Sequence, residues 1–300
     1  DYRDDVRISD NILSQLSDAY RRIRNTCRYM LSNLSDFDPS TDKVDYADLS
    51  DVDKFTLHKL GLLVEKAVKA YDTYEFHTIY HALYNFCSID LSSFYLDIAK
   101  DPLYVLPAKS LKRRGIQTVM HILTDSIARL MAPMLPFTAD EVWQHMPAYP
   151  GKEESIHLAA RAVFEPEWNN PELAGVWDKI LDIRGDVTKA LELARVQKLI
   201  GHPLDASVAL YATGENLEVL ERYKDILKDM FIVSSASLLS EKQEGAYDSP
   251  VIEDLSIVIG KAPGEKCQRC WTYDVSTGKN PVFENACDRC CKALEEIGTV

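Results

Sequence analysis

The sequence predicts a mainly α-helical protein: an antiparallel helical bundle, followed by a small α+β domain that ends in a four-cysteine zinc ribbon. Apolar side chains recur at steps of three and four over most of residues 9–131, which is the period of an amphipathic helix. Short β-like runs occur only after residue 206. Two Cys-x-x-Cys pairs, Cys267–Cys270 and Cys287–Cys290, lie near the C-terminus, and this spacing is typical of a zinc site.

The first part of the chain is predicted to contain four long amphipathic helices. Ser9 or Asp10 can cap the start of the first. Asp101-Pro102 predicts the end of the third, because proline disfavours the helical conformation in the residue before it. Helices of this length joined by short connections favour an antiparallel bundle. Their predicted ranges are 9–34, 50–86, 88–100 and 107–131.

The bundle is expected to end near residue 147, after a short helix that starts where Thr138 and Glu141 have the spacing of a capping box. Residues 148–170 are rich in proline, glycine and charge, as linkers are. The predicted domains are therefore a helical bundle at 1–147, a linker at 148–170, an α+β junction domain at 171–262 and a zinc-binding module at 263–300.

The α+β domain is predicted to begin with a helix. Asn170-Pro171 has the pattern of a cap followed by a proline in the first turn, and Gly201 has that of a C-terminal stop. A second helix is expected at 215–229. The expected strands are 207–211, 231–233 and 257–259.

One structural zinc ion is predicted, with four thiolate ligands: Cys267, Cys270, Cys287 and Cys290. A closed shell of four sulfurs leaves no position for water or substrate, so this metal is expected to hold the fold and to do no chemistry. The stretch 271–286 is expected to fold back as a short β-ribbon. Disulfide bonds are the alternative, but the other thiols, Cys27 and Cys87, lie far away in segments with the pattern of amphipathic helices, and no secretory signal opens the sequence. Cys291 follows Cys290 directly, and the two-residue spacing favours Cys290 as the ligand.

Charge and motifs exclude several classes of function. The formal net charge of −13 argues against a protein that coats nucleic acid by bulk electrostatics, although a local RNA site remains open. No phosphate-loop or nucleophile-elbow pattern occurs, and His77 and His81 lack the glutamate of a zinc protease. No apolar run has the length of a membrane span. We expect a cytoplasmic monomer with no membrane partner, and, because the chain begins at Asp1 without methionine, a fragment of a longer protein.

Six basic or aromatic residues are candidates for RNA contact: Arg21, Arg24 and Arg28 in the first predicted helix, and Arg269, Trp271 and Arg289 at the zinc knuckles. For the helix, an ordinary solvated face paired with Asp18 is the alternative. For Trp271, a platform for an unstacked base is one interpretation, and a cover over the zinc sulfurs is the other. The basic run 112–114 is interpreted as a solvated helix turn.

The helical part resembles the anticodon-binding domain of class I aminoacyl-tRNA synthetases, in the stretches DYRDDVRISDNILSQLSDAYRRIRNTCRYMLSNLSDFDP, FHTIYHALYNFCSIDLSSFYLDIAKDPLY and PMLPFTADEVWQHMP. The resemblance implies that the bundle at 1–147 is such an anticodon-binding domain. Within this class it most resembles the bacterial isoleucyl-tRNA synthetases. WDKILDIRGDVTKALELARVQKLIGHPLDASVAL resembles their C-terminal junction region, and GEKCQRCWTYD with ACDRC is similar to their terminal zinc module. The four-cysteine module favours the isoleucine enzymes over their valyl and leucyl relatives.

The resemblance implies that the chain recognises the anticodon arm of isoleucine tRNA. For the full-length enzyme it implies ATP-dependent attachment of isoleucine to that tRNA. The HIGH and KMSKS signatures that bind ATP in this family do not occur in the sequence, and no βαβ alternation is present to hold them. We therefore expect the chain to be inactive by itself, without catalytic or editing domains. The alternative is a helical scaffold whose zinc ribbon binds a protein partner, which the acidic balance favours.

Overall fold

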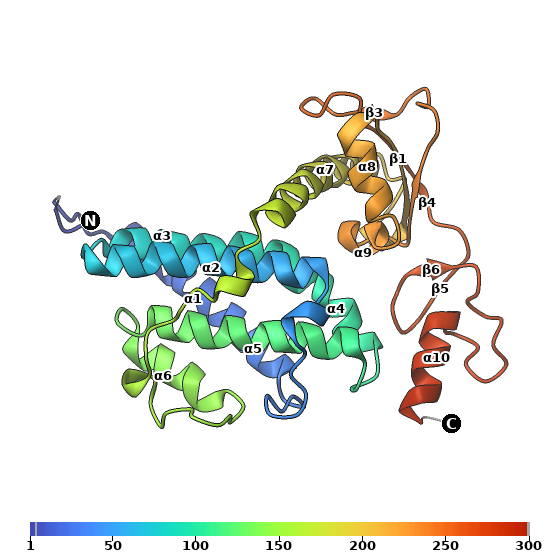
Figure 1. Ribbon diagram of the computed structural model, residues 1–300. Coiled ribbons are helices and arrows are strands. Elements are labelled where there is room, and N and C mark those ends of the chain that lie inside the picture. The colour runs from blue at the N-terminus through green and yellow to red at the C-terminus, as the bar shows by residue number, and fades with distance from the viewer. Residues whose placement is uncertain (4, 299–300) are drawn as a thin grey trace. The chain divides into compact units, whose positions relative to one another are not determined.

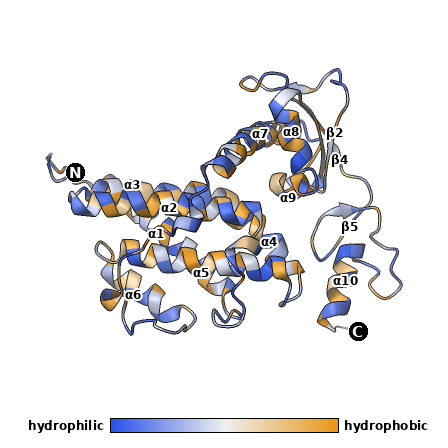
Figure 2. Ribbon diagram, in the orientation of Figure 1, coloured by the Kyte–Doolittle hydropathy of each residue, from blue (hydrophilic) through white to orange (hydrophobic). Residues whose placement is uncertain are grey.

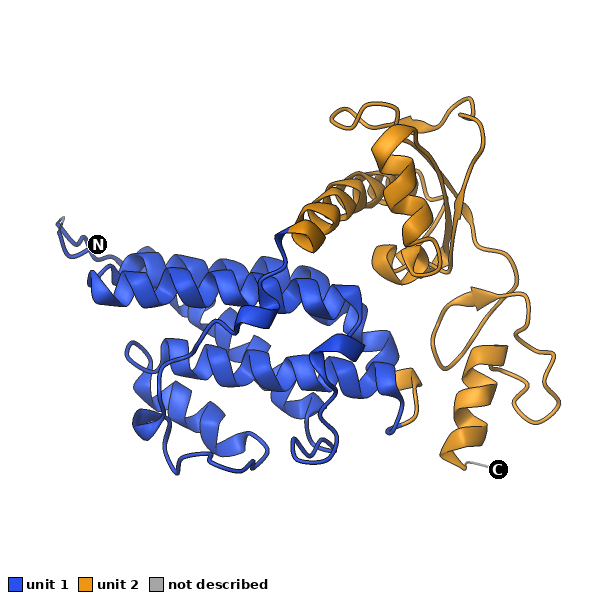
Figure 3. Ribbon diagram, viewed as in Figure 1, with its two compact units in different colours: residues 1–103, 108–171 blue, residues 104–107, 172–300 orange. Residues whose placement is uncertain are grey.

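The computed structural model describes residues 1–3 and 5–298, and the chain divides into two compact units (Figures 1 and 3). Unit 1 comprises residues 1–103 and 108–171, and unit 2 comprises residues 104–107 and 172–300. Unit 1 is helical, whereas unit 2 combines helices with two small sheets. The predicted fold class is confirmed. In the described part of the chain, no helix combines the length and the apolar character that crossing a bilayer requires.

Unit 1 is a bundle in which α2 packs against α3 and α5, while α1 packs against α5, α6 and η2 (Figure 1). Hydrophobic and hydrophilic positions alternate around these helices, so that each buries one face (Figure 2). Leu60 of α2 and Leu123 of α5 are fully buried in the shared core. The helices are α1 (Asp10–Asn33), α2 (Asp51–Asp72), α3 (Phe76–Asn85), the π-helix η2 (Phe86–Tyr95), α4 (Leu96–Val105), α5 (Leu111–Met131) and α6 (Pro136–His145). Single 3-10 turns occur at Tyr46–Asp48, Ile156–Leu158 and Pro166–Trp168.

Side-chain caps fix the starts of two of these helices. The Ser9 hydroxyl accepts a hydrogen bond from the Ile12 N–H, as predicted for α1. At the start of α2, Ser50 and Asp53 form a reciprocal capping box. The Asp53 carboxylate also accepts a hydrogen bond from the buried Tyr95 hydroxyl at 2.6 Å, which ties α2 to η2.

The prediction of one helix over 50–86 is wrong, because Tyr74 adopts the left-handed conformation with φ of 59°. The Glu75 N–H then donates to the Ala70 carbonyl at 2.7 Å and closes α2. The predicted helix end at Asp101-Pro102 is also wrong. Pro102 lies inside α4 although it lacks a backbone donor, and the next residue, Leu103, is buried in the core.

The short helix α6 starts earlier than its predicted capping box. Pro136 occupies its first turn, a position where proline needs no hydrogen-bond donor. The Thr138 hydroxyl lies 3.0 Å from the Tyr20 hydroxyl of α1 and does not cap the helix. Phe137 is 90% exposed.

His121 of α5 is a largely buried imidazole between the rings of Phe37 and Tyr149, whose centroids lie at 6.0 and 5.4 Å. Its Nε2 atom has no hydrogen-bond partner among the described residues. Burial lowers the pKa of His121 to about 4, although the nearby Asp125 carboxylate opposes the effect. The ring is therefore neutral in the folded protein at neutral pH.

We expect unit 1 to lose stability as the pH falls from about 6.5, the ordinary pKa of histidine, towards 4. The folded-state pKa of His121 is depressed, so protons bind the unfolded chain more tightly across this window and favour unfolding. The contribution of the neutral His121 ring to the free energy of unfolding is fully present above pH 6.5 and is lost below pH 4. It amounts to about 3 kcal/mol, because each pKa unit corresponds to about 1.36 kcal/mol. Urea unfolding between pH 7 and 4 should give a flatter profile for His121→Phe than for wild type. Equal slopes in His121→Phe and in the exposed-site control His157→Gln would contradict this assignment.

The main part of unit 2 contains nearly all of α7 (Pro171–Val196) and a four-stranded sheet of order β2-β1-β4-β3. β1 pairs with β2 in parallel and with β4 antiparallel, with Val208 opposite Ala236 and Ile259. Trp177 of α7 is fully buried, and its ring centroid lies 5.3 Å from that of Tyr223. The other elements are β1 (Ala206–Tyr211), α8 (Gly214–Arg222), α9 (Leu227–Phe231), β2 (Ser235–Leu238), β3 (Tyr247–Asp248), β4 (Ser256–Lys261), β5 (Glu265–Lys266), β6 (Tyr273–Asp274) and α10 (Asp288–Ile297), with a 3-10 turn at Pro203–Asp205.

Two predicted boundaries in unit 2 are corrected by left-handed residues. The predicted strand 231–233 does not form, because Phe231 ends α9 and Ile232 has φ of 55°. The stop predicted at Gly201 falls earlier, at Lys198, whose φ is 60°. There the N–H groups of Lys198 and Leu199 donate to the carbonyls of Arg195 and Ala194 at 3.0 and 2.9 Å, which is the Schellman pattern of a helix end.

Candidate metal centre and nucleic-acid interface

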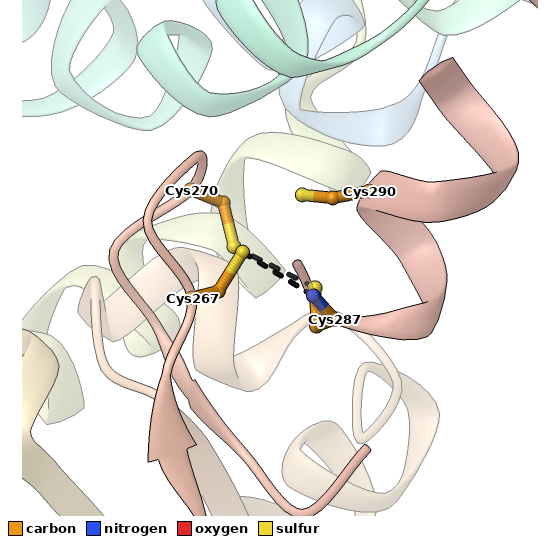
Figure 4. A group of neighbouring side chains, drawn as sticks. All are labelled: Cys267, Cys270, Cys287 and Cys290. Atoms are coloured by element: carbon orange, nitrogen blue, oxygen red, sulfur yellow. Dashed lines mark hydrogen bonds between the residues drawn. The ribbon is translucent and has the colours of Figure 1, made fainter. Parts of the chain in front are cut away.

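Four cysteines of unit 2 meet at one point (Figure 4). Their Sγ atoms all lie within 4.8 Å of one another, and only one of the four side chains is partly exposed. The four are Cys267, Cys270, Cys287 and Cys290.

The first Cys-x-x-Cys pair lies in a tight turn between β5 and β6. The Trp271 N–H donates to the Cys267 carbonyl, and the Cys267 N–H donates to the Thr272 carbonyl, both at 2.9 Å. The antiparallel pair Lys266 and Tyr273 closes this turn. The ribbon therefore encloses the first pair, whereas the prediction placed it between the two pairs.

The second pair is positioned by the start of α10. Cys287 is the N-cap residue and Cys290 lies in the first turn, so both sulfurs project on one side of the helix. The Cys287 N–H points to the Cys267 Sγ atom at 3.4 Å, which is a contact that stabilises a thiolate.

The cluster has the dimensions of a zinc site. Four ligands at 2.3 Å in tetrahedral geometry place their sulfurs about 3.8 Å apart. The Cys270 and Cys287 Sγ atoms lie 3.8 Å apart. Hydrogen bonds from its neighbours lower the pKa of Cys270, while donating to Cys270 raises the pKa of Cys287 to about 11. A cation at the centre would favour the thiolate form of all four, so these residues fit one structural zinc ion.

Cys291 lies outside this cluster although it neighbours Cys290. Its side chain is buried, and its Sγ atom faces the Ala286 carbonyl at 3.7 Å. The rest of the local core is small, with Val105 and Ala286 buried and Phe283 and Leu294 packed against them. Cysteines thus make up most of the interior of this module.

Trp271 directly follows the first pair, and its side chain is 61% exposed. An indole that is exposed to this extent shields little of the metal centre, which disfavours the interpretation that it covers the sulfurs. Its φ is 66°, a conformation that costs a residue with a side chain roughly 1–2 kcal/mol. The knuckle therefore presents an aromatic face to solvent at a cost in backbone strain.

The two arginines predicted beside Trp271 differ in their surroundings. The Arg269 Nη2 atom donates to the carbonyl of Val105, which groups with unit 2, at 2.9 Å. Part of this guanidinium is thus used to hold the module together. Arg289 lies in the first turn of α10 and is partly exposed.

The arginines of α1 follow one another at helical spacing along a single face. Arg21 and Arg28 are exposed, and Arg24 is partly exposed. Arg21 forms an ion pair with Asp18 at 3.3 Å, and Arg24 forms one with Glu141 at 3.4 Å. Exposed pairs of this kind are worth about 0–1 kcal/mol, so they leave the arginines able to exchange partners.

In the basic run 112–114, Lys112 is exposed as the sequence indicated, but Arg113 and Arg114 are not. Arg113 forms an ion pair with Asp36 at 2.8 Å, and Arg114 forms one with Asp42 at 3.2 Å. The Arg114 side chain is only 11% exposed. These two arginines fasten the loop that follows α1 to the start of α5.

Unit 2 also has a basic cleft that no pattern in the sequence indicates. Arg195, Lys198 and Lys261 line a cleft of about 550 Å³ in unit 2, together with Tyr273. The cleft joins the end of α7, the end of β4 and the zinc ribbon, which are far apart in sequence, and no spacing of residues signals it.

Comparison with known proteins defines the class of the chain. Residues 53–210 match the family described as the anticodon-binding domain of tRNA ligase, and residues 264–293 match the zinc finger found in FPG and IleRS. The chain belongs to the family of tRNA ligase anticodon-binding domains.

Proteins with similar sequences indicate which tRNA ligases the chain resembles. The chain is 49% identical over 298 residues to the isoleucine–tRNA ligase of Geobacter sulfurreducens, covering 98% of this chain and 32% of that protein. It is 44% identical over 296 residues to the isoleucine–tRNA ligase of Bacillus mycoides, covering 99% of this chain and 32% of the relative. The chain thus spans about a third of the length of the curated relatives that it matches.

Proposed function

We propose that the chain binds the anticodon arm of isoleucine tRNA, as the RNA-reading part of an ATP-dependent isoleucine–tRNA ligase. The observation that carries the proposal is the exposed Trp271 on a turn that a four-cysteine centre holds rigid. An anticodon loop offers unpaired bases, and proteins read such bases by stacking them on aromatic side chains. Arg289, partly exposed on α10, lies in the same module and can pair or stack beside the base.

The arginine face of α1 complements this site by binding phosphates. Arg21, Arg24 and Arg28 supply charge-assisted donors that hold an RNA backbone without reading its sequence. Arg28 is exposed, and the ion pair of Arg21 is to an exposed aspartate, Asp18. In a chain of net charge −13, such local clusters decide where a polyanion binds.

We assign four domains to these roles. The bundle at 1–147 binds the backbone, the segment 148–170 links it to the α+β domain at 171–262, and the module at 263–300 contacts the loop. Zinc is structural throughout. We assign amino-acid activation to other parts of a longer isoleucine–tRNA ligase, and we propose that this ligase acts as a monomer in the cytoplasm.

The test is a binding comparison between isoleucine tRNA and the same tRNA with an altered anticodon. We expect the zinc-loaded chain to bind the unaltered tRNA about tenfold more tightly, because stacking is worth about 1–3 kcal/mol per base. Fluorescence anisotropy at fixed ionic strength gives both affinities. Equal affinities, or no binding of either RNA, would favour the rival function of a scaffold that binds a protein partner.

A further inference from the structure

The cleft between α7, β4 and the zinc ribbon is a site that the proposed function does not use. Lys198, Lys261, Arg195 of the last turn of α7 and Tyr273 of the ribbon strand β6 all line it. A hydrogen bond from the Tyr273 N–H to the Ser234 hydroxyl, at 2.7 Å, fixes the ribbon to the α+β domain at this point. The cleft is therefore a built part of unit 2.

The cleft carries positive charge on side chains that can bind an anion. Within the described residues, neither the Lys198 nor the Lys261 ammonium has an ion-pair partner. Arg195 is paired with Glu192 at 3.0 Å, an exposed contact that contributes little. The one acid that lines the cleft, Asp205, already accepts hydrogen bonds from the N–H groups of Gly201 and His202 at 3.0 and 2.8 Å. These hydrogen bonds orient the Asp205 carboxylate but leave its negative charge in place. The cleft is thus lined by three basic side chains and one acid, and its charge is net positive.

Lys198 occupies a position where glycine is the ordinary residue. It is the left-handed residue of the Schellman motif that ends α7, with φ of 60°. A side chain there costs stability, and the lysine is exposed, so packing does not repay that cost. Backbone strain of this kind is concentrated at functional sites, so a strained, exposed lysine beside a cleft is a candidate for ligand binding.

We propose that this cleft binds a backbone phosphate of the RNA, held by the Lys198 and Lys261 ammonium groups. The inference rests on the proposed function and adds a second, sequence-independent contact to it. Tyr273 lies two residues from Trp271 along the same short segment. A nucleotide strand whose base stacks on Trp271 can therefore place a neighbouring phosphate over the cleft. The ligand is the phosphodiester group itself, and the cleft reads no base.

The experiment compares Lys198→Gly, Lys261→Gln and the double variant with wild type in tRNA binding by anisotropy, over a series of salt concentrations. We expect the double variant to bind about tenfold more weakly. Its plot of log K against log salt should be shallower by about 0.7 for each phosphate that the protein no longer neutralises. The same factor should apply to isoleucine tRNA and to the anticodon-altered tRNA, because binding a phosphate carries no sequence information. Lys198→Gly should melt at the wild-type temperature or above, since glycine removes the strain.

Two further variants separate the charge from the backbone. Lys198→Arg keeps the charge and should retain binding, whereas Lys198→Gln keeps the strain and should bind more weakly. Lys224→Gln removes an exposed lysine of unit 2 outside the cleft and serves as the matched control. If the double variant binds tRNA as this control does, with an unchanged salt slope, the cleft does not hold RNA, while anticodon discrimination by the wild type still stands.

A titration with inorganic phosphate at constant ionic strength tests whether the ligand of the cleft is a free phosphate ion and not a phosphodiester of RNA. Thermal stabilisation of wild type but not of the double variant, with tRNA affinity equal in both, would make the cleft a site for a small free anion and overturn the proposal. A wild-type chain that binds no tRNA would overturn both this proposal and the function on which it rests.

Discussion

Replacing Cys290 by serine should release the zinc ion and unfold the C-terminal module, while unit 1 stays folded. The interior of the module consists mostly of the metal-binding thiols, with only a few apolar side chains beside them. For zinc-finger peptides of similar size the metal supplies about 10–16 kcal/mol at neutral pH, and without it such domains do not fold. Hydrogen exchange should show the change as reduced protection across β5, β6 and α10. Metal analysis should show a fall from one zinc per chain to well under half.

Cys291→Ser provides the matched control, because it makes the same chemical change one residue away. Its thiol is also buried but faces the Ala286 carbonyl and not the cluster. This variant should keep its zinc and its protected module. Equal loss of zinc from both variants would show that the ligand set is wrong, and a Cys290→Ser protein that retains a full equivalent would do the same.

The parts of the fold that the sequence predicted are those fixed by local patterns. The 3.6-residue period places α1, α5 and α7 within a few residues, because each buries one apolar face. The zinc site was predictable for the same reason, since ligand spacing within each pair is a local property. The errors fall where tertiary packing overrides a local preference. Pro102 stays inside α4, and the Thr138 hydroxyl lies beside the Tyr20 hydroxyl of α1 and does not cap α6.

The other wrongly predicted helix and strand boundaries lie at non-glycine residues in the left-handed conformation. Residue type does not predict this conformation, because side chains with a β-carbon rarely adopt it. Tyr74 divides the long second helix, and Ile232 replaces a predicted strand by a helix end. The conformation alone does not mark function: Ile232 closes α9 and is partly buried in its own domain. Tyr74 is 65% exposed. Lys198 and Trp271 differ from both in their surroundings, because Lys198 lines the basic cleft and Trp271 directly follows a metal-binding cysteine.

The features of the candidate site that the sequence did not predict depend on residues that are distant in the chain and close in the fold. The cleft of Lys198 and Lys261 joins residues that are far apart in the chain, and only the pairing of β1 with β4 brings them to one place. The ion pairs of the arginines could not be predicted from the sequence either. Arg113 and Arg114 are as basic in sequence as Arg21 and Arg24, yet their partners Asp36 and Asp42 come from the loop after α1 and remove them from solvent.

Trp271→Gly should abolish most of the anticodon dependence of tRNA binding without harming the fold. The indole is the exposed aromatic face of the knuckle, and stacking one base on such a face contributes about 1–3 kcal/mol, so affinity for isoleucine tRNA should fall about tenfold or more. Affinity for the anticodon-altered tRNA should change much less. Anisotropy titrations with both RNAs measure the ratio, and zinc content measured on the same preparation shows that the centre is intact.

Glycine is the informative substitution at this position because it separates the ring from the backbone. Its left-handed conformation at φ of 66° costs little, so the variant should melt at or above the wild-type temperature while binding less RNA. Trp271→Phe keeps a smaller aromatic face and should retain part of the discrimination. A zinc-loaded glycine variant that still distinguishes the two anticodons as wild type does would remove Trp271 from base recognition. The strain at this residue would then need another cause, since an exposed ring that binds nothing offers no compensation for it.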